Sequence, residues 1–159
     1  MEGLSIYPAT SEDDMDDVRT LFCEYQEWLG VDLCFQDFEA ELAALPGLYA
    51  PPQGRLFLVR DEAGGDLVAC VAVRPRDGDR CEMKRLYVRK PWRGRGLGRH
   101  LTELSLEEAR AAGHRRMCLD TLAHLHEARA LYKSMGFKEI PAYYDNPLDG
   151  VTYLELALA

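Results

Sequence analysis

Hydrophobic residues follow helical spacing in some segments of the chain and strand spacing in others, with turn residues between them. Apolar positions at i, i+3, i+4 and i+7 predict amphipathic helices. The predicted helices lie at about 11–29, 35–45, 97–112 and 125–135. Short apolar runs bounded by Gly, Pro, Asn or Asp predict strands. The predicted strands lie at about 4–7, 56–59, 67–73, 81–88, 117–121, 137–140 and 151–156.

The order of these elements predicts one mixed α/β domain spanning residues 1–159, a length that suits a single hydrophobic core. Residues 67–73 are apolar on both faces, as expected of a central strand covered by helices. The strand at 117–121 follows the strand at 81–88 across one helix. Strand–helix–strand order predicts parallel pairing of these two strands.

The strand at 81–88 has an irregular pattern of apolar positions. Cys81 and Met83 stand at odd-numbered positions, whereas Leu86 and Val88 stand at even-numbered positions. Strict alternation would place the two pairs on opposite faces. One extra residue near 84–85 would bring all four to one side, so we expect a β-bulge there. A strand covered on both faces is the alternative.

A glycine-rich loop follows that strand and precedes the helix that begins near Leu97. Its glycines are Gly94, Gly96 and Gly98. Glycine lets backbone N–H groups approach a ligand, and the first N–H groups of a helix have no partner and attract anions. The segment therefore predicts a phosphate-binding site. An ordinary turn before a surface helix is the alternative.

Two familiar phosphate-binding motifs do not fit this loop. The loop of nucleotide hydrolases ends in Gly-Lys-Ser or Gly-Lys-Thr, but Gly98 is followed by Arg99 and His100. The dinucleotide fingerprint places its third glycine where this chain has Arg99.

Charge is unevenly distributed along the chain. The net charge is −8, yet residues 84–99 hold seven basic residues and no acidic one, which leaves 12 basic and 27 acidic residues elsewhere, a net −15. An acidic body repels nucleic acid, so we expect no nucleic-acid partner. The basic patch suits a small polyanion such as coenzyme phosphates. An RNA-binding module is a weaker alternative. Lys90 and Arg99 are explained equally well as charges that only keep the strand edge and the helix in contact with solvent.

The remaining composition favours a cytoplasmic protein without membrane or metal partners. The chain has no apolar run near the ~20 residues that span a bilayer, and no N-terminal secretory pattern. The five cysteines include no Cys-x-x-Cys pair, so we expect reduced, buried thiols. His124 and His126 stand two apart and do not share a helix face, so we expect no metal site.

Two segments together resemble a known family. Residues 93–98, Arg-Gly-Arg-Gly-Leu-Gly, resemble the pyrophosphate loop of the GNAT superfamily of acetyl-CoA-dependent N-acetyltransferases. Residues 128–137, Ala-Arg-Ala-Leu-Tyr-Lys-Ser-Met-Gly-Phe, resemble a second family segment, in the expected order. The resemblance covers about residues 67–140. It implies a mixed, mostly antiparallel central sheet of six to seven strands flanked by about four helices.

The resemblance also implies which residues hold acetyl-CoA, the expected co-substrate. These are Leu86, Tyr87, Val88, Arg93, Gly94, Arg95, Gly96, Leu97, Gly98 and Arg99. In the family the bulged strand holds the acetyl carbonyl, a role that the N–H of Val88 would fill. The chain departs from the family at Leu125, where members often have an asparagine that contacts the coenzyme.

The reaction implied is acetyl transfer to a primary amine by direct attack in a ternary complex. An alkyl ammonium with a pKa of ~10.4 must first lose a proton, and Glu82 occupies the family's position for that base, acting directly or through water. The alternative for Glu82 is a surface charge paired with Arg85 or Lys84. Tyr132 occupies the position of the general acid for the leaving thiolate; the alternative is a core aromatic.

The acceptor amine is not identified by the resemblance and would belong to a small molecule, a peptide or a protein. Trp28 and Phe35 would wall its site, and residues 141–150, with Tyr143 and Tyr144, would border it. Two further alternatives stay open: a catalytically silent acyl-CoA-binding module of the same fold, and a homodimer, since family members often dimerise.

Overall fold

The computed structural model describes residues 1–158, apart from the side chain of Phe35. The strands are β1 (Leu4–Pro8), β2 (Arg55–Asp61), β3 (Leu67–Asp77), β4 (Arg80–Val88), β5 (Arg116–Leu122), β6 (Lys138–Ile140) and β7 (Val151–Ala157). The α-helices are α1 (Glu12–Leu29), α2 (Phe38–Ala44), α3 (Leu97–Ala111) and α4 (His126–Ser134). Short 3-10 helices occupy Cys34–Gln36, Gly47–Tyr49 and Lys90–Trp92.

The strands form a seven-stranded sheet in the order β1-β2-β3-β4-β5-β7-β6. Only the β4–β5 pair is parallel among the described strands, and α3 connects its two members. The other neighbouring strands pair antiparallel. This confirms the predicted mixed, mostly antiparallel sheet flanked by four helices.

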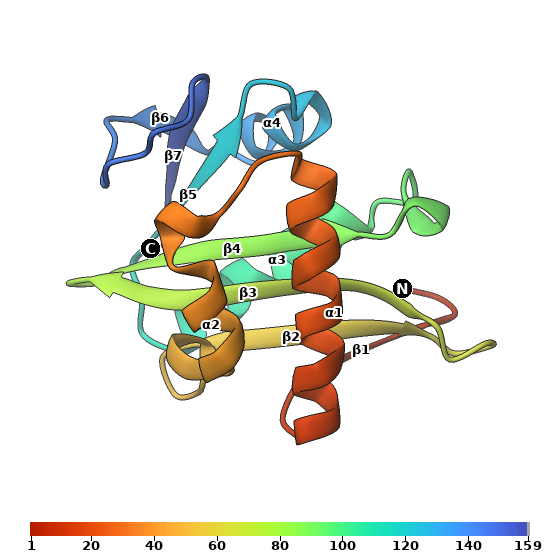
Figure 1. Cartoon of the computed structure of the whole chain (residues 1–159). Coiled ribbons are helices and arrows are strands. Elements are labelled where there is room, and N and C mark those ends of the chain that lie inside the picture. The colour runs from red at the N-terminus through yellow and green to blue at the C-terminus, as the bar shows by residue number, and fades with distance from the viewer. Residues whose placement is uncertain (159) are drawn as a thin grey trace.

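Helices cover both faces of the sheet, giving three layers (Figure 1). On one face α1 and α2 bury Val18, Phe22 and Phe38 against the sheet. On the other face α3 and α4 bury residues such as Leu101 and Tyr132. β3 lies between the two cores and is buried from Leu67 to Val73, because helices cover both of its faces.

Cysteine burial differs in part from the expectation. Cys70, Cys81 and Cys118 are buried, but Cys23 and Cys34 are exposed, and all five are free thiols. Cys23 lies on the outer side of α1 and Cys34 at the start of the 3-10 helix that follows, where solvent reaches both. Within residues 1–158, no helix combines the length and the hydrophobicity that a membrane crossing requires.

Candidate functional site

β4 carries the predicted bulge at its middle. Two of its residues, Arg85 and Leu86, lie opposite the single residue Val71 of β3, and Arg85 has a φ of 61°. The extra residue reverses the alternation of side chains. Leu86 and Val88 therefore pack against the same core as Met83, on the side of α3 and α4.

β4 and β5 separate just before the bulge. Their pairing runs from Arg80 opposite Arg116 to Glu82 opposite Cys118 and stops there. Beyond this point β4 keeps only its β3 partner. The N–H of Arg89 donates to Val68 of β3 (2.8 Å). Since successive N–H groups along a strand alternate in direction, the N–H of Val88 faces the opened side, as its expected role requires.

A groove of about 480 Å³ runs beside the opened end of β4 and the start of α3. It is lined by Leu86, Tyr87, Val88, Arg93, Gly94, Gly96, Leu97 and Gly98, all predicted to bind the coenzyme. Gly94 and Gly96 have φ values of 79° and 80°, a conformation that side chains strain. Gly96 is the N-cap of α3 and offers no capping side chain, which leaves the first-turn N–H groups free.

Two of the predicted coenzyme residues lie outside this lining. Arg95 is exposed and points back to the carbonyl of Pro91. Arg99 is also exposed and donates to the hydroxyl of Ser134 (2.6 Å). By contrast Arg93 is held in the groove, where its Nε donates to the carbonyl of Val88 (2.7 Å).

The opposite wall of the groove was predicted only in part, through Trp28 as a wall of the acceptor site and Leu125 at a family coenzyme position. It comes from Trp28, Trp92, His124, Leu125, His126, Glu127, Ala128 and Leu131. The apolar stripe of α4 was the available signal for the other wall residues. Leu125 is the N-cap of α4 and makes no capping hydrogen bond. It therefore offers the groove an apolar side chain where the family often has a polar one.

A second, smaller cavity of about 90 Å³ lies where β4 and β5 separate. Its polar lining residues include Gln36, Lys84, Arg85, Asp120, Thr121 and Asn146. Trp28, Leu86, Leu125 and Ala128 line both this cavity and the groove. The two spaces therefore meet beside the bulge.

A chain of hydrogen bonds crosses the lining of the small cavity. The ammonium of Lys84 donates to the amide oxygen of Gln36 (2.9 Å), and the amide nitrogen of Gln36 donates to the hydroxyl of Tyr144 (3.2 Å). Asn146 also donates to that hydroxyl (2.9 Å). The hydroxyl itself donates to a carboxylate oxygen of Asp120. This chain holds a cation and an anion in one small cavity.

Tyr132 of α4 also lines the small cavity. Its side chain is 6% exposed, and its ring packs against Phe137 with centroids 5.6 Å apart. Burial raises the pKa of its phenol, so the group keeps its proton at neutral pH. The residue is thus a core aromatic that also lines the cavity with its phenol protonated.

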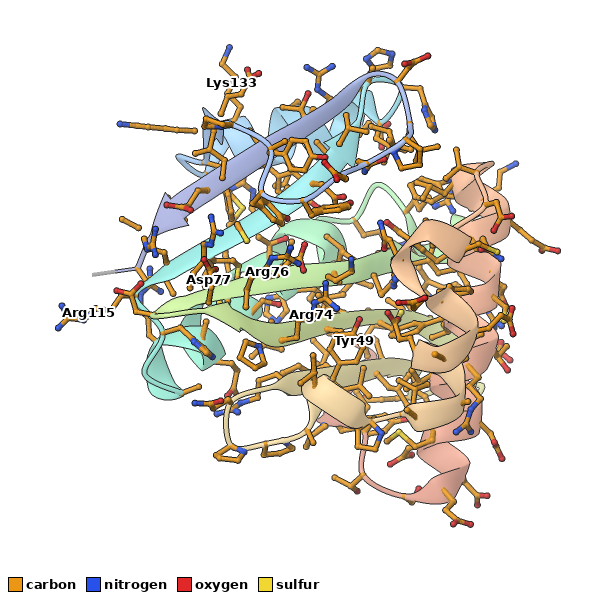
Figure 2. The ribbon with its side chains drawn as sticks, turned by 60° about the vertical axis from the view of Figure 1, so that its left-hand side comes forward. Tyr49, Arg74, Arg76, Asp77, Arg115 and Lys133 are labelled. Carbon is orange, nitrogen blue, oxygen red and sulfur yellow. The ribbon has the colours of Figure 1, made fainter. Side chains whose placement is uncertain are left out.

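Glu82 lies in a buried polar cluster rather than in the lining of either space. Its side chain is fully buried; one oxygen accepts from Arg74 (2.9 Å) and Arg76 (3.3 Å), the other from Tyr143 (2.6 Å). Figure 2 shows Arg74 and Arg76 following one another along β3. The ion-pair partners of Glu82 are therefore Arg74 and Arg76, and not Arg85 or Lys84 as the sequence alternative expected.

The charges around Glu82 decide its protonation state. Burial alone would raise the pKa of this carboxyl. Lys84 and Arg74 outweigh that effect, together with the Tyr143 hydroxyl and Arg76, and the pKa falls below its ordinary 4.5. Glu82 is thus ionised at neutral pH, and it is a weaker base than an unperturbed glutamate.

Several site residues were missed from the sequence, and others stay as expectations. Arg74 and Asp120 carried no motif; only their position on buried strands marked them. Trp28 lines both spaces although it is 42% exposed. Residues 141–150 supply Tyr143 and Tyr144 to the polar network, and their place beside the acceptor stays a prediction. The side chain of Phe35 lies outside the described residues.

Comparison with known proteins agrees with this geometry. A model of the acetyltransferase (GNAT) family matches residues 15–137. An uncharacterized N-acetyltransferase of Schizosaccharomyces pombe is 43% identical over 158 residues, which cover 99% of this chain and 96% of the relative.

Two solved structures share the fold over nearly the whole chain. An acetyltransferase of the GNAT family from Staphylococcus aureus has a TM-score of 0.80 and 17% identity, covering 98% of this chain and 99% of the other. Spermidine N-acetyltransferase from Vibrio cholerae, in complex with CoA and spermine, has a TM-score of 0.70 and 16% identity, covering 99% and 97%. With a bulged strand opening beside a glycine loop and a family match over most of its length, this chain belongs to the GNAT family and is an N-acetyltransferase.

Proposed function

We propose that the protein transfers the acetyl group of acetyl-CoA to a primary amine by direct attack within a ternary complex. The observation that carries this proposal is the junction of the two spaces beside the bulge. The groove suits the coenzyme, and the small cavity suits the end of an acceptor. Because they share Leu86 and Ala128, an amine in the cavity and a thioester in the groove would meet without an acylated enzyme.

The amine needs a base in the small cavity, and Asp120 is better placed for that role than Glu82. Asp120 is half-buried, lines the cavity and accepts a hydrogen bond from a neutral phenol, Tyr144. Glu82 lies outside the lining, and two arginines hold its charge. The prediction that Glu82 takes the proton stays open; it would need a relay through water.

The acetyl carbonyl becomes an oxyanion as nitrogen attacks, and donors that face it lower the barrier. The N–H of Val88 would serve this role from the open edge of β4. As the C–N bond forms, the C–S bond breaks and the thiolate of coenzyme A leaves. Tyr132 would donate a hydrogen bond to that sulfur, and its raised pKa keeps the donor proton in place.

Acetyl-CoA is expected to stabilise the protein, and Gly96→Asp is expected to abolish that effect. Ligand at a hundred times its Kd stabilises by ~2.7 kcal/mol. The substitution would put a carboxylate among the N–H groups that should meet phosphate. Thermal melts with and without acetyl-CoA measure both effects. Gly78→Asp is the matched control, because Gly78 also has positive φ and open space but lies in the β3–β4 turn. A wild-type protein that saturating ligand fails to stabilise would contradict the coenzyme assignment.

Tyr132→Phe is expected to lower the rate of acetyl transfer by about 10²-fold, at the lower end of the range for general acids. A phenol with its ordinary pKa of ~10 transfers its proton uphill to a thiolate of ~8.5, so hydrogen bonding to sulfur is the main contribution. Single-turnover acetyl transfer measures the effect. Tyr49→Phe is the control, since the Tyr49 hydroxyl is buried without a partner among the described residues. A wild-type rate of the chemical step in Tyr132→Phe would show that Tyr132 has only a packing role.

The activity is tested against the behaviour of a catalytically silent acyl-CoA-binding module of the same fold. Such a module predicts the same stabilisation by acetyl-CoA but no release of free coenzyme A with any amine. A thiol assay across amines, amino acids, polyamines and peptides separates the two.

A further inference from the structure

Lys84 is a buried cation with too few partners. Its side chain is 6% exposed, and its ammonium has three N–H donors. Within the described residues it makes one hydrogen bond, to the neutral amide of Gln36, and no carboxylate lies within ion-pairing distance. A buried charge is costly unless it is paired. Burial lowers the pKa of Lys84 from 10.5 to about 8, although Glu82 and Asp120 oppose that shift.

Two of the acidic groups around Lys84 are already engaged by arginines. Glu82 is held by Arg74 and Arg76, and Glu41 is paired with Arg85 at 2.9 Å. Lys84 and Asp120 therefore line the cavity as a cation and an anion, neither with an ion-pair partner among the described residues.

A second group in the cavity also lacks a partner. The hydroxyl of Thr121 is buried, with the residue 5% exposed, and it has no hydrogen-bond partner among the described residues. Buried polar groups in folded proteins are nearly always satisfied, so this hydroxyl would gain a hydrogen bond from a water or a ligand that reached it. On the remaining wall Asp120 supplies a carboxylate. The lining thus offers a cation and an anion, with the buried hydroxyl of Thr121 beside them.

We propose that the acceptor is a small amino acid, whose carboxylate is bound by Lys84 and whose amine faces Asp120. The proposal rests on the proposed acetyl transfer and names its substrate class. The chain Lys84–Gln36–Tyr144–Asp120 fixes the two charges relative to one another, which suits a ligand with opposite charges at a fixed separation.

Charge argues against the other amine classes. A cavity of about 90 Å³ holds a small polar molecule or the end of a longer one, so the charges of its lining distinguish the classes. A polyamine would bring further positive charge toward Lys84. A lysine side chain of a protein would present an amine with no carboxylate for Lys84 to bind.

The test is equilibrium binding of the twenty L-amino acids to the coenzyme A-bound protein, followed by steady-state acetyl transfer. For each amino acid that binds, the matched probes are its carboxamide and its decarboxylated amine. We expect both probes to bind about 10- to 100-fold more weakly, the usual loss when a hydrogen bond to a charged group is removed. Equal binding of the decarboxylated amine, or no binding by any amino acid, would overturn the proposal.

Variants of Lys84 give a second readout. Lys84→Met should raise KM for the amino acid by about 10- to 100-fold with kcat changed less than threefold, and leave the carboxamide unaffected. Lys84→Arg should recover most of the loss. Lys138→Met, an exposed lysine of β6, is the control. A Lys84→Met enzyme with unchanged KM would refute the assignment.

These measurements separate the substrate class from the reaction. Lys84-dependent binding of an amino acid without acetyl transfer would keep the carboxylate site and overturn the proposed function. Acetylation of amines without a carboxylate, in preference to every amino acid, would keep the reaction and overturn the substrate class.

Discussion

Asp120→Asn is expected to lower kcat/KM for acetyl transfer by about 10²–10⁴-fold, the contribution usual for a general base. The amide keeps the size of the side chain and can still accept the hydrogen bond of Tyr144, but it cannot take a proton. The affinity for acetyl-CoA should not change, because Asp120 lines the small cavity and not the groove. Steady-state kinetics with a thermal-shift titration of acetyl-CoA measures both.

The control for this variant is Asp149→Asn, which changes an exposed carboxylate in the loop before β7. It should retain full activity. The comparison with Glu82→Gln decides which acid is the base. A loss below about threefold in Asp120→Asn, together with a large loss in Glu82→Gln, would return the role to Glu82.

Glu82→Gln is expected to lower the free energy of unfolding by about 3–5 kcal/mol, the cost of breaking a buried ion pair from one side. Arg74 and Arg76 would then be left facing each other without the charge that compensates them. Denaturant unfolding measures the difference. Glu108→Gln is the control, because its ion pair with Arg55 is about one-third exposed and should be worth less than ~1 kcal/mol.

The lowered pKa of Glu82 also predicts a pH dependence. A carboxyl whose folded pKa lies below 4.5 adds stability above that pH and loses it as the pH falls through the folded value. Stability of the wild type should therefore drop more steeply below pH 4.5 than that of Glu82→Gln. The prediction is contradicted if stability falls equally with pH in the two proteins, because protonation of Glu82 would then not destabilise the fold.

Local sequence determined the elements, the bulge and the glycine loop before α3. The spacing of apolar residues predicted the strands and helices in their observed order, because side-chain periodicity depends only on near neighbours. The switch of apolar residues from odd to even positions between Met83 and Leu86 located the bulge for the same reason. Gly94 and Gly96 marked the loop, since positive φ is a property of one residue's own backbone.

Only the tertiary structure decided which charged groups line the small cavity. Glu82 is bound by Tyr143, 61 positions later in the chain, and Lys84 by Gln36, 48 positions earlier. Such partners determine whether a carboxylate is a base or a structural ion, and whether a lysine is free for a ligand. No local pattern contains them, because they meet only when the sheet and its two helical layers are assembled.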